Sequence, residues 1–235
     1  MADSRVILEG STKNIISTKK DDEVLLLFKD SETAFDGEKK AKFKDKGLIR
    51  KNISKCVFEF LNSYNIPNHY IKEYEGNSLL VKKLEMIPLS VVIYNISAGA
   101  LSKRFKLKQG QILKYPVIEY YLKKENANDL FIAESHAYAF NYATPEEMKH
   151  IARLSSKVNA VLKSFMDRRR LKLVNYKLEF GRYRNQIFLA DEITPDTARL
   201  WHIGDENNVN MKYFNFENSK AKQAYNQIYE RFLGR

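Results

Sequence analysis

Two segments near the C-terminus decide the fold, because together they predict a β-hairpin. They read LKLVNYKLEF (171–180) and QIFLA (186–190), and GRYRN (181–185) lies between them. Both segments are rich in aliphatic and aromatic side chains, as β-strands are, and a glycine and an asparagine favour a turn between them. The sequence therefore predicts two antiparallel strands in this part of the chain.

Outward from this hairpin, short β-rich runs predict further strands at 24–28, 78–86, 89–94 and 117–123. We interpret Ile87-Pro88 as a connector between two of them, and the charge run 38–46 as a solvated loop. Apolar residues at helical spacing predict helices at 48–64, from Thr144 onward and around 221–232. Thr144-Pro145-Glu146-Glu147 reads as a capping box with proline at the first helical position. Strands come early and helices later, so the predicted class is α+β rather than a regular alternation.

Composition limits the classes of protein to consider. The chain has 235 residues, a formal net charge of +11 and one cysteine, Cys56. A single cysteine excludes an internal disulfide and a cysteine-rich zinc site. No apolar run approaches the roughly 20 residues of a membrane helix, and the first residues do not resemble a secretion signal. We therefore expect a cytoplasmic protein without a membrane partner.

The positive charge has two interpretations. It can reflect a lysine-rich solvated surface, or a partner that carries negative charge, such as a nucleic acid or a phosphorylated small molecule. Net charge alone does not separate these interpretations.

Glu179 and Asp191 are the first candidate functional pair. Each lies near one end of an arm of the predicted hairpin, so their carboxylates can converge on one Mg²⁺, a metal that prefers oxygen ligands. Lys177 lies on the same face as Glu179 and could contact a phosphate. The alternatives are ordinary surface acids and an ordinary ion pair across the strands.

Asp196 and Arg199 follow in the next loop. An arginine there can hold a phosphate or a carboxylate with two hydrogen bonds, or it can simply pair with Asp196. The four histidines show no ligand spacing, and we assign them no catalytic role. The sequence contains neither a Walker loop nor a G-x-G-x-x-G motif, so a bound ATP would need another device for its phosphates.

The same segments resemble the signature blocks of the SAICAR synthetase (phosphoribosylaminoimidazole-succinocarboxamide synthase) family. The resemblance is carried by KLEFG (177–181), ADEITPD (190–196) and RLW (199–201), and by GSTK (10–13), TAFDG (33–37), KKLEMIP (82–88), SAG (97–99), KRF (103–105) and PVIEYY (116–121). These blocks occur in the family's order and span nearly the whole chain.

The resemblance implies a small β-rich nucleotide-binding lobe, 1–85, packed on a larger α+β lobe, 86–235, with ATP in the cleft between them. It implies an ATP-dependent, amide-forming ligase of purine biosynthesis. The enzyme would activate the carboxylate of 4-carboxy-5-aminoimidazole ribonucleotide (CAIR) as an acyl phosphate and condense it with L-aspartate, with Mg²⁺ as metal. Nucleic acid is not an expected partner, and a homo-oligomer is compatible with the family.

The resemblance also implies roles for individual residues. Glu179 and Asp191 would hold Mg²⁺, and Lys177 and Asp36 would act at the reacting groups. Four residues would bind the nucleotide: Lys13, Lys82, Met86 and Lys123. Five would face the second substrate: Arg199, Tyr94, Ala100, Asn175 and Asn215.

The chain departs from the family's usual residues mainly on the side of the imidazole ribonucleotide. Tyr94 and Asn215 stand where the family usually has arginine, and Ala100 stands where it usually has serine. Other departures are Ser90 for glutamate, Arg50 and Lys51 for a pair of asparagines, and Asn175 for aspartate. Three hypotheses follow: a divergent SAICAR synthetase, a paralogue that uses another carboxylate or amine in a specialised nucleoside or secondary-metabolite pathway, or a non-catalytic nucleotide or RNA binder.

Overall fold

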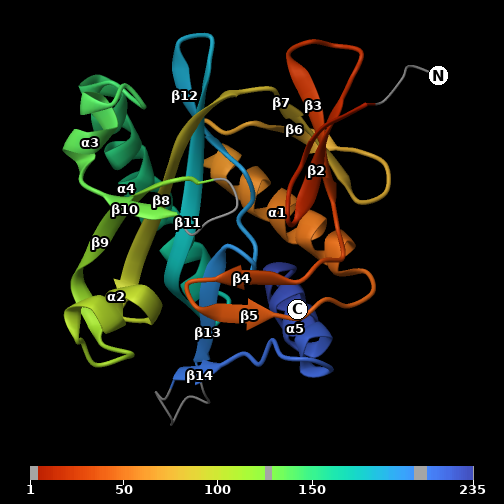
Figure 1. The fold of residues 1–235 in the computed structure, drawn as a ribbon. Coiled ribbons are helices and arrows are strands. Elements are labelled where there is room, and N and C mark those ends of the chain that lie inside the picture. The colour runs from red at the N-terminus through yellow and green to blue at the C-terminus, as the bar shows by residue number, and fades with distance from the viewer. Residues whose placement is uncertain (1–4, 125–128, 204–210, 235) are drawn as a thin grey trace.

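The computed structural model describes residues 5–124, 129–203 and 211–234, and within them two large antiparallel sheets, a separate two-stranded hairpin and five helices (Figure 1). The first sheet has the strand order β1-β2-β3-β7-β6. Its strands are β1 (Val6–Glu9), β2 (Lys13–Ser17), β3 (Glu23–Phe28), β7 (Ser78–Lys82) and β6 (Tyr70–Glu73). All of them precede residue 85, and alternate residues of β3 are buried against α1 (Lys46–Ser63).

The second sheet holds the long strands of the protein. Its order is β10-β9-β8-β11-β13-β14, with β12 paired to β11. These strands are β10 (Leu130–Ile132), β9 (Ile112–Leu122), β8 (Glu85–Ile96), β11 (Leu171–Tyr183), β13 (Ala198–Ile203), β14 (Met211–Tyr213) and β12 (Gln186–Ala190). A separate hairpin of β4 (Thr33–Phe35) and β5 (Glu38–Lys40) lies beside β13 in Figure 1.

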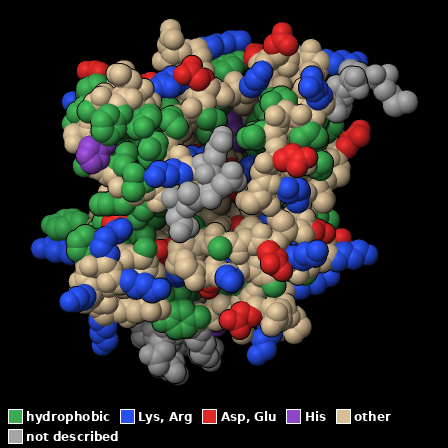
Figure 2. Space-filling view, in the orientation of Figure 1, with side chains coloured by type: hydrophobic (Ala, Val, Ile, Leu, Met, Phe, Trp, Pro, Cys, Tyr) green, Lys and Arg blue, Asp and Glu red, His purple; other side chains and the backbone are tan. Residues whose placement is uncertain are grey.

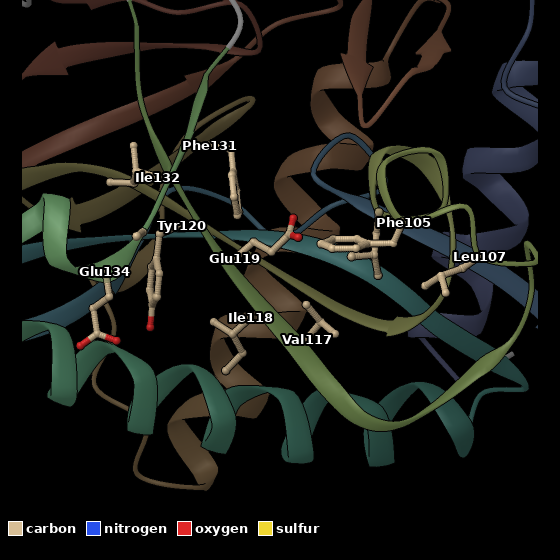
Figure 3. A pocket seen from close by; sticks show the side chains of 11 residues that line it. Phe105, Leu107, Val117, Ile118, Glu119, Tyr120, Phe131, Ile132 and Glu134 are labelled. Carbon is tan, nitrogen blue, oxygen red and sulfur yellow. The ribbon is translucent and has the colours of Figure 1, made fainter.

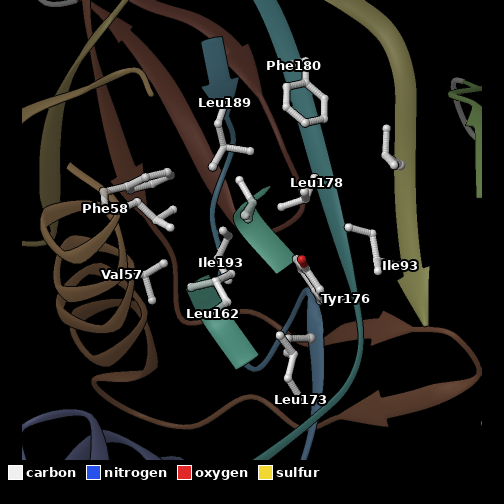
Figure 4. Packing of buried hydrophobic residues seen from close by; sticks show 14 of the residues in the cluster. Val57, Phe58, Ile93, Leu162, Leu173, Tyr176, Leu178, Phe180, Leu189 and Ile193 are labelled. Carbon is white, nitrogen blue, oxygen red and sulfur yellow. The ribbon is translucent and has the colours of Figure 1, made fainter. Parts of the chain in front are cut away.

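The remaining helices are α2 (Gly99–Phe105), α3 (Glu134–Ala139), α4 (Pro145–Asp167) and α5 (Lys220–Phe232). The apolar core is continuous from α1 through β11 to α4. Figure 4 shows Tyr176 and Leu178 of β11 next to Leu162 of α4, with Val57 of α1 on the far side of that helix. This shared core fixes the strand ends that carry the charged residues described below.

The secondary-structure predictions are largely confirmed. The hairpin 171–190 is β11 and β12, although its turn is shorter than expected because Gly181 still pairs with Phe188. The capping box is present: Thr144 Oγ1 accepts from the Glu147 N–H at 3.2 Å, and Glu147 Oε2 accepts from the Thr144 N–H at 2.8 Å. The α+β class is confirmed as well.

Two predictions are wrong. Ile87-Pro88 is no connector, since β8 runs through it. The missing N–H of Pro88 is tolerated because the register between β8 and β11 is already irregular there, between Glu179 and Gly181. The run 38–46 is no solvated loop either. It contains β5 and the first residue of α1, and Lys40 and Lys46 are buried because backbone carbonyls and Asp196 receive their ammonium groups.

The proposed division at residue 85 stays a prediction. The change of sheet between Lys82 and Glu85 supports it, whereas the hairpin β4–β5 contacts the second sheet although it precedes that boundary.

Candidate active site

A large central cavity, with a volume of about 1590 Å³, lies between the two sheets. Figure 2 shows the surface hollowed where the first sheet, at the upper right, meets the rest of the molecule. Apolar side chains of the first sheet line one part of the cavity, among them Val24, Leu26 and Val81. Charged residues of β11 and of the segment after β12 line another part.

Glu179 and Asp191 lie together in this cavity because of the hairpin register. Glu179 pairs with Ala190, so Asp191 emerges opposite it, in the left-handed conformation with φ 62°. The Lys177 ammonium joins the two carboxylates, at 2.6 Å from Glu179 Oε1 and 3.7 Å from Asp191 Oδ2. The carboxylates therefore converge on one position that a cation can occupy.

Two further lysines complete this cluster. Lys123 Nζ lies 2.6 Å from Glu179 Oε2, and Lys13 Nζ lies 2.5 Å from Asp191 Oδ1 and 2.9 Å from Glu192 Oε1. Burial disfavours the charge of Lys13, but the two neighbouring carboxylates outweigh it and raise the pKa of the ammonium. Burial likewise opposes the ionised form of Asp191, but Lys13 and Lys177 hold the pKa of this carboxyl well below its usual range. Lys13 and Asp191 therefore form a pair of opposite charges at neutral pH.

The donor set fits Mg²⁺. Two carboxylates are what this ion usually takes from a protein, and phosphate oxygens and water complete its octahedron. The part of the chain that the structure describes contains no group of three or more acidic, histidine or cysteine side chains that could form an all-protein metal cage. The arrangement therefore suits a metal ion that takes its remaining ligands from bound phosphate groups and water.

A second polar cluster surrounds Asp36, at the turn of the hairpin β4–β5. Its Oδ2 accepts from Arg199 Nη1 and Asn175 Nδ2, each at 2.7 Å, and its Oδ1 accepts from the Ala100 N–H at 2.8 Å. The Tyr94 hydroxyl lies 3.4 Å from Oδ1. Asp36, Tyr94 and Ala100 line the central cavity. Arg199 and Asn175 do not line it, and their hydrogen bonds keep the Asp36 carboxylate in place.

A third group of charged residues is buried around Asp196. Arg50 Nε donates to Asp196 Oδ2 at 2.6 Å, and Lys46 Nζ lies 3.2 Å from Asp196 Oδ1. Burial lowers the pKa of Lys46 to about 8, although Asp196 stabilises its charge. The Thr33 hydroxyl also donates to Asp196, so this carboxylate ties the start of β4 to the loop before β13.

A smaller pocket of about 570 Å³ lies between α2, β9 and α3 (Figure 3). Its lining is mostly apolar, and the Glu119 carboxylate that points toward Phe105 already pairs with Arg104 at 2.6 Å. We therefore place the candidate active site in the central cavity, where charged groups converge.

Comparisons with known proteins show which family the chain is similar to. The family model described as SAICAR synthetase matches residues 6–232. The chain is 38% identical to the phosphoribosylaminoimidazole-succinocarboxamide synthase of Prosthecochloris aestuarii, over 96% of each chain. The crystal structure of the synthase of the same name from Ehrlichia chaffeensis superposes with a TM-score of 0.88, at 35% identity, over 98% of this chain and 99% of that one. A SAICAR synthetase in complex with ADP superposes with a TM-score of 0.87, at 39% identity, over 97% of each chain.

The chain belongs to the SAICAR synthetase family. Membership makes it an enzyme, an ATP-dependent carbon–nitrogen ligase. Among the described residues, no helix is long and apolar enough to cross a membrane.

Most of the site residues expected from the resemblance to SAICAR synthetases lie in or against the central cavity. Lys82 lines it, with its ammonium 5.5 Å from the centre of the Phe188 ring, and burial lowers its pKa. Met86 lines it from β8 and is 41% exposed. Asn215 is different: it is exposed, does not line the cavity, and its Oδ1 accepts from the Glu217 N–H at 2.9 Å.

Several residues near the SAICAR synthetase site were not singled out by the sequence. Asp129 lines the cavity, with Oδ2 at 3.3 Å from the Ser90 hydroxyl. Glu192 lines the cavity and pairs with Lys13, and His69 forms part of the cavity wall. Asp196, which the sequence offered as a partner of Arg199, pairs with Arg50 and Lys46, whereas Arg199 pairs with Asp36. The only sequence signal for Glu192 was its place in the block 190–196. No spacing rule indicated His69.

Proposed function

We propose that this protein catalyses the ATP-dependent condensation of CAIR with L-aspartate in purine biosynthesis. The observation that supports this best is the pair Glu179–Asp191, joined by one ammonium at the end of a large cavity in a chain of this family. The ADP complex of a relative with 39% identity supports the use of ATP.

ATP would occupy the part of the cavity next to the first sheet. Its base would lie against the apolar side chains of the neighbouring residues Val24 and Val81, with Met86 at its edge. Its phosphates would meet Lys13, Lys82 and Lys123. Glu179 and Asp191 would hold Mg²⁺, which when bound offsets the negative charge of the phosphate oxygens. The lysines that neutralise these carboxylates would then be free to contact the phosphates.

The second substrate would lie between this charged cluster and Asp36. Lys177 would contact the carboxylate that is activated, and its ion pairs with Glu179 and Asp191 from the cavity wall support this role. Asp36, with Tyr94 and the Ala100 N–H beside it, offers hydrogen bonds to polar groups of the substrate. Arg199 and Asn175 would act through Asp36 as positioning residues. Asn215, which is exposed and does not line the cavity, would take no part.

The proposed chemistry has two displacements. A carboxylate oxygen of CAIR attacks the γ-phosphorus of ATP, and ADP leaves as an acyl phosphate forms. The amine of aspartate then attacks the acyl carbon, inorganic phosphate leaves, and the nitrogen loses a proton as the amide forms. The lysine cluster promotes both steps by holding the reactants in place and by stabilising negative charge where it develops.

Tyr94 and Ala100, which line the cavity beside Asp36, stand where the family usually has arginine and serine. These two substitutions are the reason to test directly whether CAIR is the substrate. A cytoplasmic location, a homo-oligomeric state and the absence of a nucleic-acid partner stay predictions; on the face seen in Figure 2, basic and acidic side chains are interspersed.

The proposal is tested by incubating the protein with CAIR, L-aspartate, ATP and Mg²⁺, and by measuring the succinocarboxamide product and ADP by mass spectrometry. We expect product from the wild type, and at least about a hundredfold less from Lys177→Met, because a buried charge contact to the reacting groups contributes roughly 2.7–4 kcal/mol. Lys172→Met, a change of a half-exposed lysine on the same strand, serves as the control and should keep full activity. ADP binding without any product from CAIR would contradict the proposed substrate.

A further inference from the structure

The hairpin β4–β5 carries Asp36 at its turn but has little support from neighbouring strands. Each of its two strands has three residues, and among the strands that the structure describes they pair only with each other. An isolated two-stranded hairpin is at best marginally stable in water. Side-chain contacts must therefore fix the position of this hairpin and of Asp36.

The Lys46 ammonium joins the two ends of the hairpin. Lys46 is the first residue of α1, and its Nζ donates to the Ser31 carbonyl, just before β4, at 3.0 Å. The same Nζ donates to the Ala41 carbonyl, just after β5, at 3.1 Å, and lies 3.4 Å from the Lys40 carbonyl. One buried cation thus holds the chain where it enters the hairpin and where it leaves it.

Lys46 also links the hairpin to the segment that carries Arg199. Its Nζ lies 3.2 Å from Asp196 Oδ1, and the Thr33 hydroxyl at the start of β4 donates to the same oxygen. Arg199 follows in this segment and binds the Asp36 carboxylate at the turn. The segment 196–199 therefore holds the base of the hairpin through Lys46 and its turn through Arg199.

The proposed chemistry does not use the charge of Lys46. Its side chain is fully buried, and it is not among the residues that line the central cavity. A buried charge is unfavourable unless it is paired and hydrogen-bonded. Here the compensating groups are Asp196 and the carbonyls at the two ends of the hairpin, so the buried charge and the position of the hairpin depend on each other.

From these contacts we infer that Lys46 is a positioning residue, which fixes the base of the hairpin β4–β5 and thereby places the Asp36 carboxylate for the second substrate. The part that concerns the substrate rests on the proposed function. Lys46 acts through Asp36 and does not touch the substrate. A shift at the base of the hairpin reaches its turn because no neighbouring strand among the described residues resists it.

The first test combines kinetics with nucleotide binding. In Lys46→Met we expect the KM for CAIR to rise at least about tenfold with kcat unchanged, the pattern that a lost contact with bound substrate produces. ADP affinity, measured by calorimetry with Mg²⁺ present, should not change, because Lys46 does not line the cavity. Lys44→Met changes an exposed lysine close to Lys46 in the chain and is the matched control, with wild-type values expected.

Hydrogen exchange, followed by mass spectrometry, gives a second readout that does not depend on CAIR. Peptides that cover 31–41 should exchange at least about tenfold faster in Lys46→Met than in the wild type, because local opening becomes easier. Peptides that cover 171–190 should exchange equally in both proteins. Thr33→Val is a milder variant that decides the matter if Lys46→Met does not fold. It removes the hydroxyl between Lys46 and Asp196, and we expect about threefold changes in the same two readouts.

An unchanged KM for CAIR would overturn the inference, and so would unchanged exchange of 31–41. Parallel losses of kcat, ADP affinity and protection in both peptide regions would also overturn it, because they would show general destabilisation. If the wild type forms no product from CAIR, the proposed substrate is refuted. Faster exchange confined to 31–41 would then still support the role of Lys46 in placing Asp36.

Discussion

Arg199 Nη1 donates to Asp36 Oδ2 at 2.7 Å, and this bond joins β13 to the hairpin β4–β5 across 163 residues of sequence. A second donor of the same guanidinium, Nη2, reaches the Asp36 carbonyl at 2.9 Å. Asp36 has φ 48°, a left-handed conformation that few residues adopt without support. The arginine therefore fixes both the backbone and the carboxylate that faces the cavity.

Gly99 packs against this carboxylate so closely that no side chain fits. A Cβ on Gly99 would lie 1.8 Å from Asp36 Oδ2, and Gly99 has φ +53°. We expect Gly99→Ala to displace Asp36 and to lower kcat/KM for CAIR at least about tenfold, since a hydrogen bond to a charged group contributes roughly 1.5–3 kcal/mol. ADP affinity, measured by calorimetry, should stay the same.

Gly76→Ala is the matched control. Gly76 has φ +59°, but nothing lies within 4 Å of an added Cβ. Both variants carry the same backbone strain of about 1–2 kcal/mol. Equal activity losses in the two variants would show that Gly99 acts only through backbone strain.

Glu179→Gln should uncouple ADP binding from Mg²⁺. The wild type should bind ADP more tightly with Mg²⁺ than with a chelator. In the variant, the gain in ADP affinity caused by Mg²⁺ should shrink at least about tenfold. Even residues that only hydrogen-bond to metal ligands contribute that much to metal affinity. Glu146→Gln, on the exposed first turn of α4, is the control. A wild type whose ADP affinity does not respond to Mg²⁺ would refute the assignment of Glu179 and Asp191.

Arg50→Met should destabilise the protein strongly. The side chains of Arg50 and Asp196 are both fully buried, and breaking such a pair leaves a buried charge, which costs about 3–5 kcal/mol. Lys46 still pairs with Asp196, so we expect about 3 kcal/mol in urea unfolding. Lys51→Met, one residue further along α1, should cost below about 1 kcal/mol because its partner Glu73 is 41% exposed. Similar losses in both variants would contradict the special role of the Arg50–Asp196 pair.

Glu73 should make a small, pH-dependent contribution to stability. Hydrogen bonds from Lys51 and Lys55 lower its pKa from 4.5 to about 2. The pKa is lower in the folded state, so the contribution is fully present above pH 4.5 and is lost as the pH falls through 2. Solvent screens the pair, and we expect Glu73→Gln to cost only about 0.5–1 kcal/mol at pH 7. The difference in free energy of unfolding between wild type and variant should narrow from pH 5 to pH 3. A constant difference would show that the ion pairs contribute nothing.

Much of the fold could be predicted from the sequence, because local patterns encode it. The capping box at Thr144 started α4 where it was expected, and the hairpin 171–190 brought Glu179 opposite Ala190. The sequence prediction was wrong where groups from distant parts of the chain pair with charges that look solvated. Lys40 and Lys46 read as solvated charges, but carbonyls and a carboxylate from elsewhere in the chain receive them.

The sequence by itself determined the family, the α+β class and the hairpin that carries Glu179 and Asp191 near its ends, since motif order and local β-pattern are properties of the chain. Only the tertiary structure showed that Arg199 and Asn175 hold Asp36 from behind, that Asn215 lies outside the cavity, and that His69 lines it. The physical reason is distance along the chain: these contacts join residues that no spacing rule relates, and packing of the two sheets and their helices alone brings them together.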